Sequence, residues 1–97
     1  MSEKKVAIIT GAASGIGRAS AKKFSQEGYT VAIIDWNQDI KTVGEELRNA
    51  GGECFDFVGD VSSEEDVKKF VKETEKRYGR IDVMNCNAGI VVVKPLE

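Results

Sequence analysis

The residues of this chain best suited to chemistry are the glycines of one short turn, Thr10-Gly11-Ala12-Ala13-Ser14-Gly15-Ile16-Gly17. The turn stands between an apolar run at 6–9 and a segment with helical periodicity at 16–27. The first N–H groups of a helix have no helical partner, and the helix dipole favours an anion beside them. We therefore predict a diphosphate-binding turn, to which these residues contribute: Gly11, Ser14, Gly15, Ile16 and Gly17.

The three glycines have separate expected roles. Gly11 permits a tight reversal of the chain, Gly15 keeps a Cβ away from the diphosphate, and Gly17 lets the following helix pack closely. The spacing Gly-x-x-x-Gly-x-Gly differs from the commoner Gly-x-Gly-x-x-Gly, and glycines also occur in ordinary turns. A purely structural turn is therefore the alternative interpretation.

An acidic residue at the end of the second apolar run favours a dinucleotide as the ligand. Asp35 ends the next apolar run, eighteen residues after Gly17, where a carboxylate can accept both hydroxyls of an adenosine ribose. The Asp35 carboxylate would repel a 2′-phosphate about 4 Å away by about 4 kcal/mol per charge pair, before the protein and solvent relax. The next residues, Trp36 and Asn37, bring no positive charge, so we predict NAD in preference to NADP. The alternative is a solvated acid at a strand end.

Two further segments follow predicted strands and can reach the same ligand. The Asp60 carboxylate could accept from the adenine amine, with Val61 contributing its backbone; alternatively, Asp60 helps to cap the next helix. Asn87, Ala88 and Gly89 are small enough for the backbone to approach a ribose, although they could also form an ordinary turn.

Short apolar runs alternate with helical patterns along the whole chain. We expect strands near 5–10, 29–35, 53–58 and 81–86, and helices near 16–27, 38–50 and 63–78. This order predicts an α/β fold, a Rossmann-like doubly wound parallel sheet, in one domain over residues 1–97. The uninterrupted apolar runs at 6–9 and 31–34 predict central strands, whereas alternation at 53–58 predicts an edge strand. Helical spacing places these side chains on core-facing stripes: Ile16, Ser20 and Phe24 in the first helix, and Ile40, Val43, Leu47 and Ala50 in the second.

Composition narrows the classes of function. A formal charge of -2 and 31% charged residues give no reason to expect nucleic acid or a membrane surface as a partner. Apolar runs of four or five residues are too short to span a bilayer, and with no secretory segment we expect a cytoplasmic protein. The absence of histidine and the wide separation of Cys54 and Cys86 argue against a metal site and against any His-based catalytic set. Both thiols are expected to be buried and reduced.

Taken together, these motifs resemble the short-chain dehydrogenase/reductase family, in particular its 3-oxoacyl-carrier-protein reductase-like members. The resemblance rests on the turn at 10–17, Asp35, Asp60-Val61 and Asn87-Ala88-Gly89. It implies a partial sheet of about four strands in the order 3-2-1-4 with three helices. It also implies an NAD(P)-dependent oxidoreductase that moves hydride between nicotinamide and the carbonyl or hydroxyl group of a small molecule. In one departure, Cys86 stands where the family usually has the first Asn of Asn-Asn-Ala-Gly.

The resemblance also implies a Ser-Tyr-Lys mechanism, with the Tyr and Lys four residues apart. Tyr29 and Tyr78 are followed at that distance by Ile33 and Asp82, so no catalytic residue is assigned. We expect the chain to be the N-terminal, dinucleotide-binding part of a longer enzyme; a stand-alone, non-catalytic binding module and a half-domain kept as a folding unit are the alternatives. The fourth strand then becomes a sheet edge, whose exposed flank favours association into a homo-oligomer.

Overall fold

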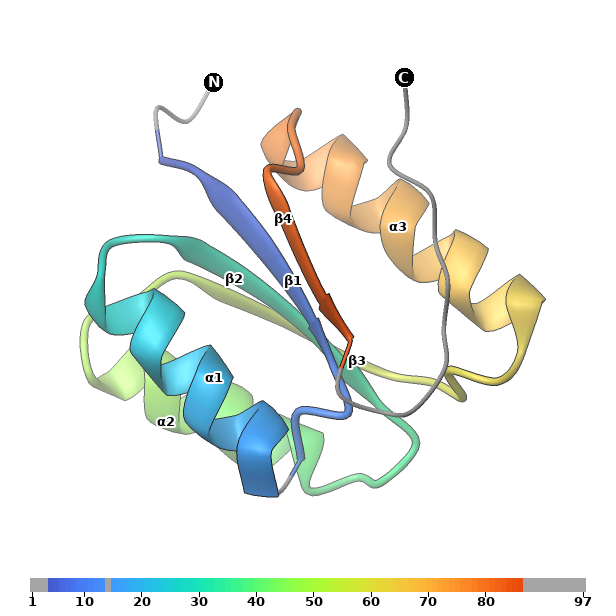
Figure 1. The fold of residues 1–97 in the computed structure, drawn as a ribbon, viewed down its shortest axis with the longest axis horizontal. Helices are drawn as coiled ribbons and strands as arrows, with labels where there is room; N and C mark the ends of the chain where they lie inside the picture. The colour runs from blue at the N-terminus through green and yellow to red at the C-terminus, as the bar shows by residue number, and fades with distance from the viewer. Residues whose placement is uncertain (1–3, 14, 87–97) are drawn as a thin grey trace.

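The computed structural model describes residues 4–13 and 15–86, which form one parallel sheet with helices on both faces (Figure 1). The four strands lie in the order β3-β2-β1-β4. The elements follow one another along the chain as β1 (Val6–Thr10), α1 (Gly15–Gln26), β2 (Thr30–Asp35), α2 (Ile40–Asn49), β3 (Cys54–Val58), α3 (Glu64–Tyr78) and β4 (Val83–Cys86). The predicted fold class and strand order are confirmed.

Alternate residues of the central strands face opposite layers of the core. Ile9 and Ile33 point to the face covered by α1 and α2, whereas Ile8 and Ile34 point to the face covered by α3. All four side chains are fully buried. This burial on both faces explains why β1 and β2 are apolar without interruption.

The side chains that cover the two faces differ in size. The face of α1 and α2 is filled by small and aliphatic residues such as Ala21, Val43 and Leu47. On the other face Phe70 of α3 stacks on Phe55 of β3, with ring centroids 6.0 Å apart. Arg18 of α1 also binds both carboxylate oxygens of Glu46 at 2.6 Å, which ties α1 to α2. Because these helices follow β1 and β2, their packing sets where the connecting loops lie.

The parallel register brings the carboxyl ends of the strands to one edge of the sheet. Thr10 pairs with Ile34, and Asp35 pairs with Val58. The loops that leave β1, β2 and β3 therefore start side by side. At the opposite edge, Asp82 fixes the start of β1, because its Oδ2 accepts from the N–H of Val6 at 2.8 Å.

The predicted boundaries of the helices are close to those observed. Ser63 caps α3 by accepting from the N–H of Asp66, and Gly79 ends that helix with φ 78°. Two positions on the predicted stripes are corrected. Ile16 is 75% exposed because it stands in the first turn of α1, beyond the edge of the sheet, and Ala50 is exposed because α2 has already ended at Asn49.

Two smaller findings concern the described part of the chain. No helix within it is long and apolar enough to cross a bilayer. Cys54 is a buried free thiol on β3, as predicted, and burial raises its pKa to about 12.

Gly17 offers a direct test of how tightly α1 begins. A Cβ built on Gly17 would strike the carbonyl oxygen of Gly11, a backbone atom that cannot rotate away. We expect Gly17→Ala to lower the free energy of unfolding by about 1–3 kcal/mol, despite the better helix propensity of alanine. Urea denaturation measures the change.

The matched control is Ala19→Gly, at an exposed position of the same helix. It removes a methyl group rather than adding one, and we expect it to cost about 1 kcal/mol from helix propensity alone. A Gly17→Ala variant as stable as the original chain would contradict the close contact between α1 and the turn.

Candidate functional site

The glycine-rich turn leaves the carboxyl end of β1 in the conformation that its glycines allow. Gly11 has φ 63°, and its N–H donates to the carbonyl oxygen of Ile34 at 2.9 Å. Gly15 also has φ 63°, and a Cβ built there would meet nothing within 4 Å. The turn therefore has open space beside Gly15, whereas Gly17 is packed against the backbone of Gly11.

Asp35 lies against this turn. It is the last residue of β2 and is only 9% exposed, and its Oδ2 accepts from the N–H of Ala13 at 3.1 Å. Its Oδ1 accepts from the N–H of Asn37 at 3.0 Å. The carboxylate thus joins the turn after β1 to the loop after β2. An ionised carboxylate has about four acceptor positions, so one remains on each oxygen for a further donor.

The loop between β2 and α2 is held by a second contact of the same kind. Asn37 Oδ1 accepts from the N–H of Asp39 at 2.9 Å, and the Asn37 carbonyl accepts from the N–H of Ile40. Short side chains that bind the backbone two residues ahead are typical of tight turns. The loop is therefore fixed from Asp35 to the start of α2.

The backbone N–H groups of the turn divide into two sets. Those of Gly11 and Ala13 are already bonded within the protein. The N–H groups at the start of α1, from Gly15 to Gly17, belong to the helical turn whose donors have no helical acceptor. These donors, with the positive end of the helix dipole, are suited to an anionic group such as a diphosphate.

Asp60 and Val61 follow β3 at the same edge of the sheet. Asp60 Oδ1 accepts from both the Oγ of Ser62 at 2.7 Å and the N–H of Ser62 at 2.9 Å. These bonds, the side-chain bond first, lower the pKa of the exposed Asp60 carboxyl. Asp60 does not cap α3, because Ser63 does; it shapes the turn that leads to that cap.

The remaining predicted site residues have different outcomes. Ile16 belongs to the exposed first turn of α1 beside the open space at Gly15. Ser14 and 87–89 lie outside the described residues, so the predictions for Ser14, Asn87, Ala88 and Gly89 stand as made. Trp36, which follows Asp35, is 73% exposed and leaves a large aromatic surface beside the acid.

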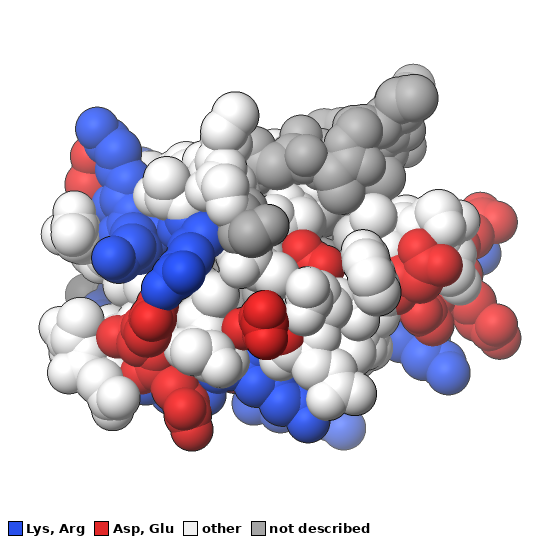
Figure 2. All heavy atoms as spheres, turned by 90° about the horizontal axis from the view of Figure 1, so that it is seen from below, with Lys and Arg blue, Asp and Glu red and all other residues white. Residues whose placement is uncertain are grey.

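Figure 2 views the molecule from the edge at which the strands end. Acidic and uncharged side chains occupy the middle of this face, and basic side chains gather toward its margins. Among the described residues, no basic side chains gather in the middle of this face.

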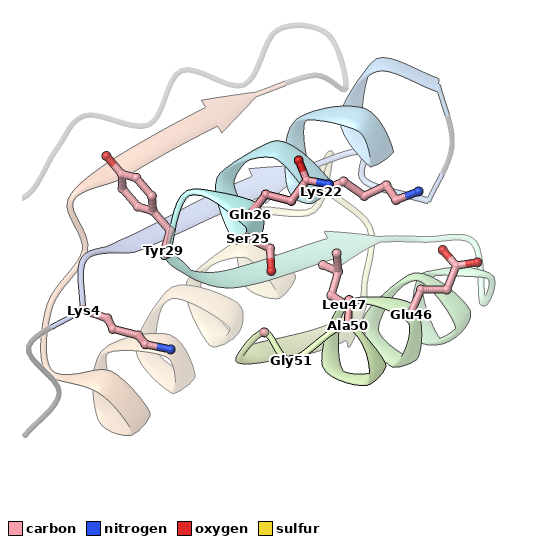
Figure 3. Close-up of a pocket in the computed structure, with 11 residues that line it drawn as sticks. Lys4, Lys22, Ser25, Gln26, Tyr29, Glu46, Leu47, Ala50 and Gly51 are labelled. Carbon is pink, nitrogen blue, oxygen red and sulfur yellow. The ribbon is translucent and has the colours of Figure 1, made fainter.

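A cavity of about 380 Å³ lies at the other edge of the sheet (Figure 3). It is bordered by the C-terminal halves of α1 and α2 and by residues that precede the strands, among them Lys4, Gly28 and Gly52. Most of its lining lies toward the amino ends of the strands, whereas the glycine-rich turn follows the carboxyl end of β1. The predicted site residues are not among those that line it.

Comparison with known proteins identifies the family. The model of the short chain dehydrogenase family matches residues 5–97. The chain belongs to the short-chain dehydrogenase/reductase family. It is 42% identical over 99% of its length to the short-chain dehydrogenase/reductase eriH of Hericium erinaceus, of which it covers 40%. It is 36% identical over 96% of its length to an NAD-dependent glycerol dehydrogenase of Listeria innocua, of which it covers 36%.

Solved structures of the family have the same fold. An actinorhodin polyketide ketoreductase bound to NADPH superposes on 91% of this chain with a TM-score of 0.85 at 36% identity, and this chain covers 34% of it. The chain therefore spans about two fifths or less of these short-chain dehydrogenase/reductase relatives. The family consists of oxidoreductases whose members use nicotinamide dinucleotides.

The sequence interpretation missed two partners of Asp35. Asn37 could have been found, because the alternation Asp35-Trp36-Asn37-Gln38-Asp39 places short polar side chains two residues apart, a signal for successive turns. Ala13 carries no such signal. Its role depends on a backbone N–H that meets Asp35 across 22 residues of chain.

The pKa of Asp60 tests the turn after β3. Because Ser62 stabilises the ionised carboxylate, we expect Ser62→Ala to raise the pKa of Asp60 toward the value of a free aspartate. The folded-state pKa lies below the unfolded one, so this contribution to stability is present at neutral pH and is lost as the pH falls through the folded value. Side-chain carboxyl NMR titration measures the midpoint. An unchanged midpoint in Ser62→Ala would contradict the described turn.

Proposed function

We propose that this chain binds a nicotinamide adenine dinucleotide at the carboxyl edge of its sheet. One observation carries the proposal: the Asp35 carboxylate lies within hydrogen-bonding distance of the glycine-rich turn, at 3.1 Å from the nitrogen of Ala13. A sugar-binding acid and a phosphate-binding helix start are thereby adjacent, as one ribose and its diphosphate require. The proposed contacts come from Gly11, Ser14, Gly15, Ile16, Gly17, Asp35, Asp60, Val61, Asn87, Ala88 and Gly89.

The arrangement fits the cofactor from the chain's own geometry. The open space in front of Gly15 admits a diphosphate, and the start of α1 supplies N–H donors. The acceptor positions that remain on Asp35 match the two hydroxyls of a ribose. Trp36 offers its exposed ring to the adenine beyond that ribose.

The preferred cofactor is NAD. A 2′-phosphate would be placed beside the charged Asp35, and the following residues Trp36 and Asn37 add no compensating cation. The relatives include an NAD-dependent glycerol dehydrogenase and a ketoreductase bound to NADPH, so the preference rests on this acid rather than on the family.

In the whole enzyme, the cofactor bound here would exchange a hydride with the carbonyl or hydroxyl carbon of a small-molecule substrate. The nicotinamide supplies the hydride chemistry when bound. The described residues of this chain bind and orient the adenosine and diphosphate portion, and no catalytic group is assigned among them.

Cofactor binding to the chain tests the proposal. We expect NAD to bind, to add about 2.7 kcal/mol to stability at a hundred times its Kd, and to bind at least about tenfold more tightly than NADP. Because Asp35→Ala removes the repulsion, we expect the ratio of the NADP Kd to the NAD Kd to fall toward one. Isothermal titration calorimetry measures both constants.

Asp39→Ala is the matched control, since it removes the same charge from an exposed position in the same loop. We expect it to leave the preference for NAD unchanged. Absence of NAD binding to the original chain, or an equal change of preference in both variants, would contradict the proposal.

A further inference from the structure

Asp35 has contacts that recognition of a sugar does not require. Its two oxygens accept from two backbone N–H groups, Ala13 in the turn after β1 and Asn37 in the loop after β2. The bond to Ala13 is buried and joins segments 22 residues apart. Recognition of a ribose by itself requires neither a buried carboxylate nor a bond from that carboxylate to the backbone of another loop.

The Ala13 N–H is one of the groups that fix the described part of the turn. Gly11 is held by its bond to Ile34, and Gly17 is held by its contact with Gly11. Between them, the bond from the Ala13 N–H to Asp35 ties the middle of the turn to the end of β2. The conformation of the residues that lead into α1 therefore depends on the charge and shape of the Asp35 carboxylate.

We propose that Asp35 is a positioning residue for the glycine-rich turn in addition to being a ligand for ribose, so that one carboxylate couples diphosphate binding to sugar recognition. This inference rests on the proposed function. The bonds to Ala13 and Asn37 use one acceptor position on each oxygen and leave one on each for the sugar, so both roles can be filled at once. Loss of the Asp35 carboxylate should therefore weaken binding even of a ligand whose ribose has no hydroxyl to donate to it.

Two substitutions of Asp35 remove its backbone contacts to different extents and so test the positioning role. In Asp35→Asn, one oxygen becomes an NH₂ group, a donor that faces a backbone donor, so only one of the two N–H groups can keep its acceptor. The variant is almost isosteric with the original, and we expect the turn to loosen without a change in the core. Asp35→Ala removes both acceptors.

The first measurement needs no cofactor. Hydrogen exchange followed by NMR should show a protected Ala13 amide in the original chain and exchange about tenfold faster or more in Asp35→Asn and Asp35→Ala. A scalar coupling across the hydrogen bond, from the Ala13 nitrogen to the Asp35 carboxyl carbon, should be detectable in the original chain. This second readout does not depend on any variant remaining folded.

The second measurement uses an NAD analogue whose adenosine ribose lacks both hydroxyls. If Asp35 only bound the sugar, its substitution would leave the Kd of this 2′,3′-dideoxy analogue unchanged. We expect instead that Asp35→Asn weakens binding of the analogue by about tenfold or more.

Asp82→Asn is the matched control, because Asp82 also accepts from a backbone N–H, that of Val6, at the far end of β1. It should speed exchange of the Val6 amide and leave unchanged the exchange of the Ala13 amide and the Kd values of NAD and of the analogue. A general loss of stability would instead speed exchange at both amides.

The outcomes distinguish this inference from the proposed function. Unchanged Ala13 exchange in Asp35→Asn, a missing scalar coupling, or equal analogue Kd values in the original and the variant would overturn the positioning role. A protected Ala13 amide in a chain that binds no NAD would instead refute the proposed function, and with it any role of Asp35 in coupling cofactor contacts.

Discussion

The site depends on the contact between the Asp35 carboxylate and the backbone of the glycine-rich turn. An aspartate that is 9% exposed at a strand end must have its oxygens satisfied, and the N–H groups of Ala13 and Asn37 satisfy one position on each. These two bonds leave a second acceptor position on each oxygen of the same carboxylate. Under the proposed function, one side chain of this short-chain dehydrogenase/reductase would meet a requirement of folding and a requirement of ligand binding.

The parallel sheet makes this contact possible. Because β1 and β2 run in the same direction and in close register, the turn after Thr10 and the acid that ends β2 reach the same edge. The close approach of Gly17 to Gly11 then aims the start of α1 at that edge. The bond between Arg18 and Glu46 holds α1 against α2 on one face of the sheet. This contact helps to fix the position of the start of α1.

The sequence predicted the parts of the fold that follow from local patterns. Continuous apolar runs identified β1 and β2 as central strands, because strands buried on both faces are apolar at every position. Alternation of apolar and polar residues identified β3 as an edge strand, because one of its faces is less buried. Ile16 was misplaced because periodicity does not show where a helix extends past the sheet. The bond from Ala13 to Asp35 was not predicted, since a backbone donor has no residue type to reveal it.

Amide chemical shifts recorded during an NAD titration test the central claim most directly, since they report where the dinucleotide binds. The account predicts the largest shifts at 15–17 and 35–37, at the carboxyl edge of the sheet. It predicts small shifts at Gly28, Gly51 and Gly52, which border the cavity at the opposite edge. Shifts concentrated around that cavity, with the glycine-rich turn unaffected, would contradict it.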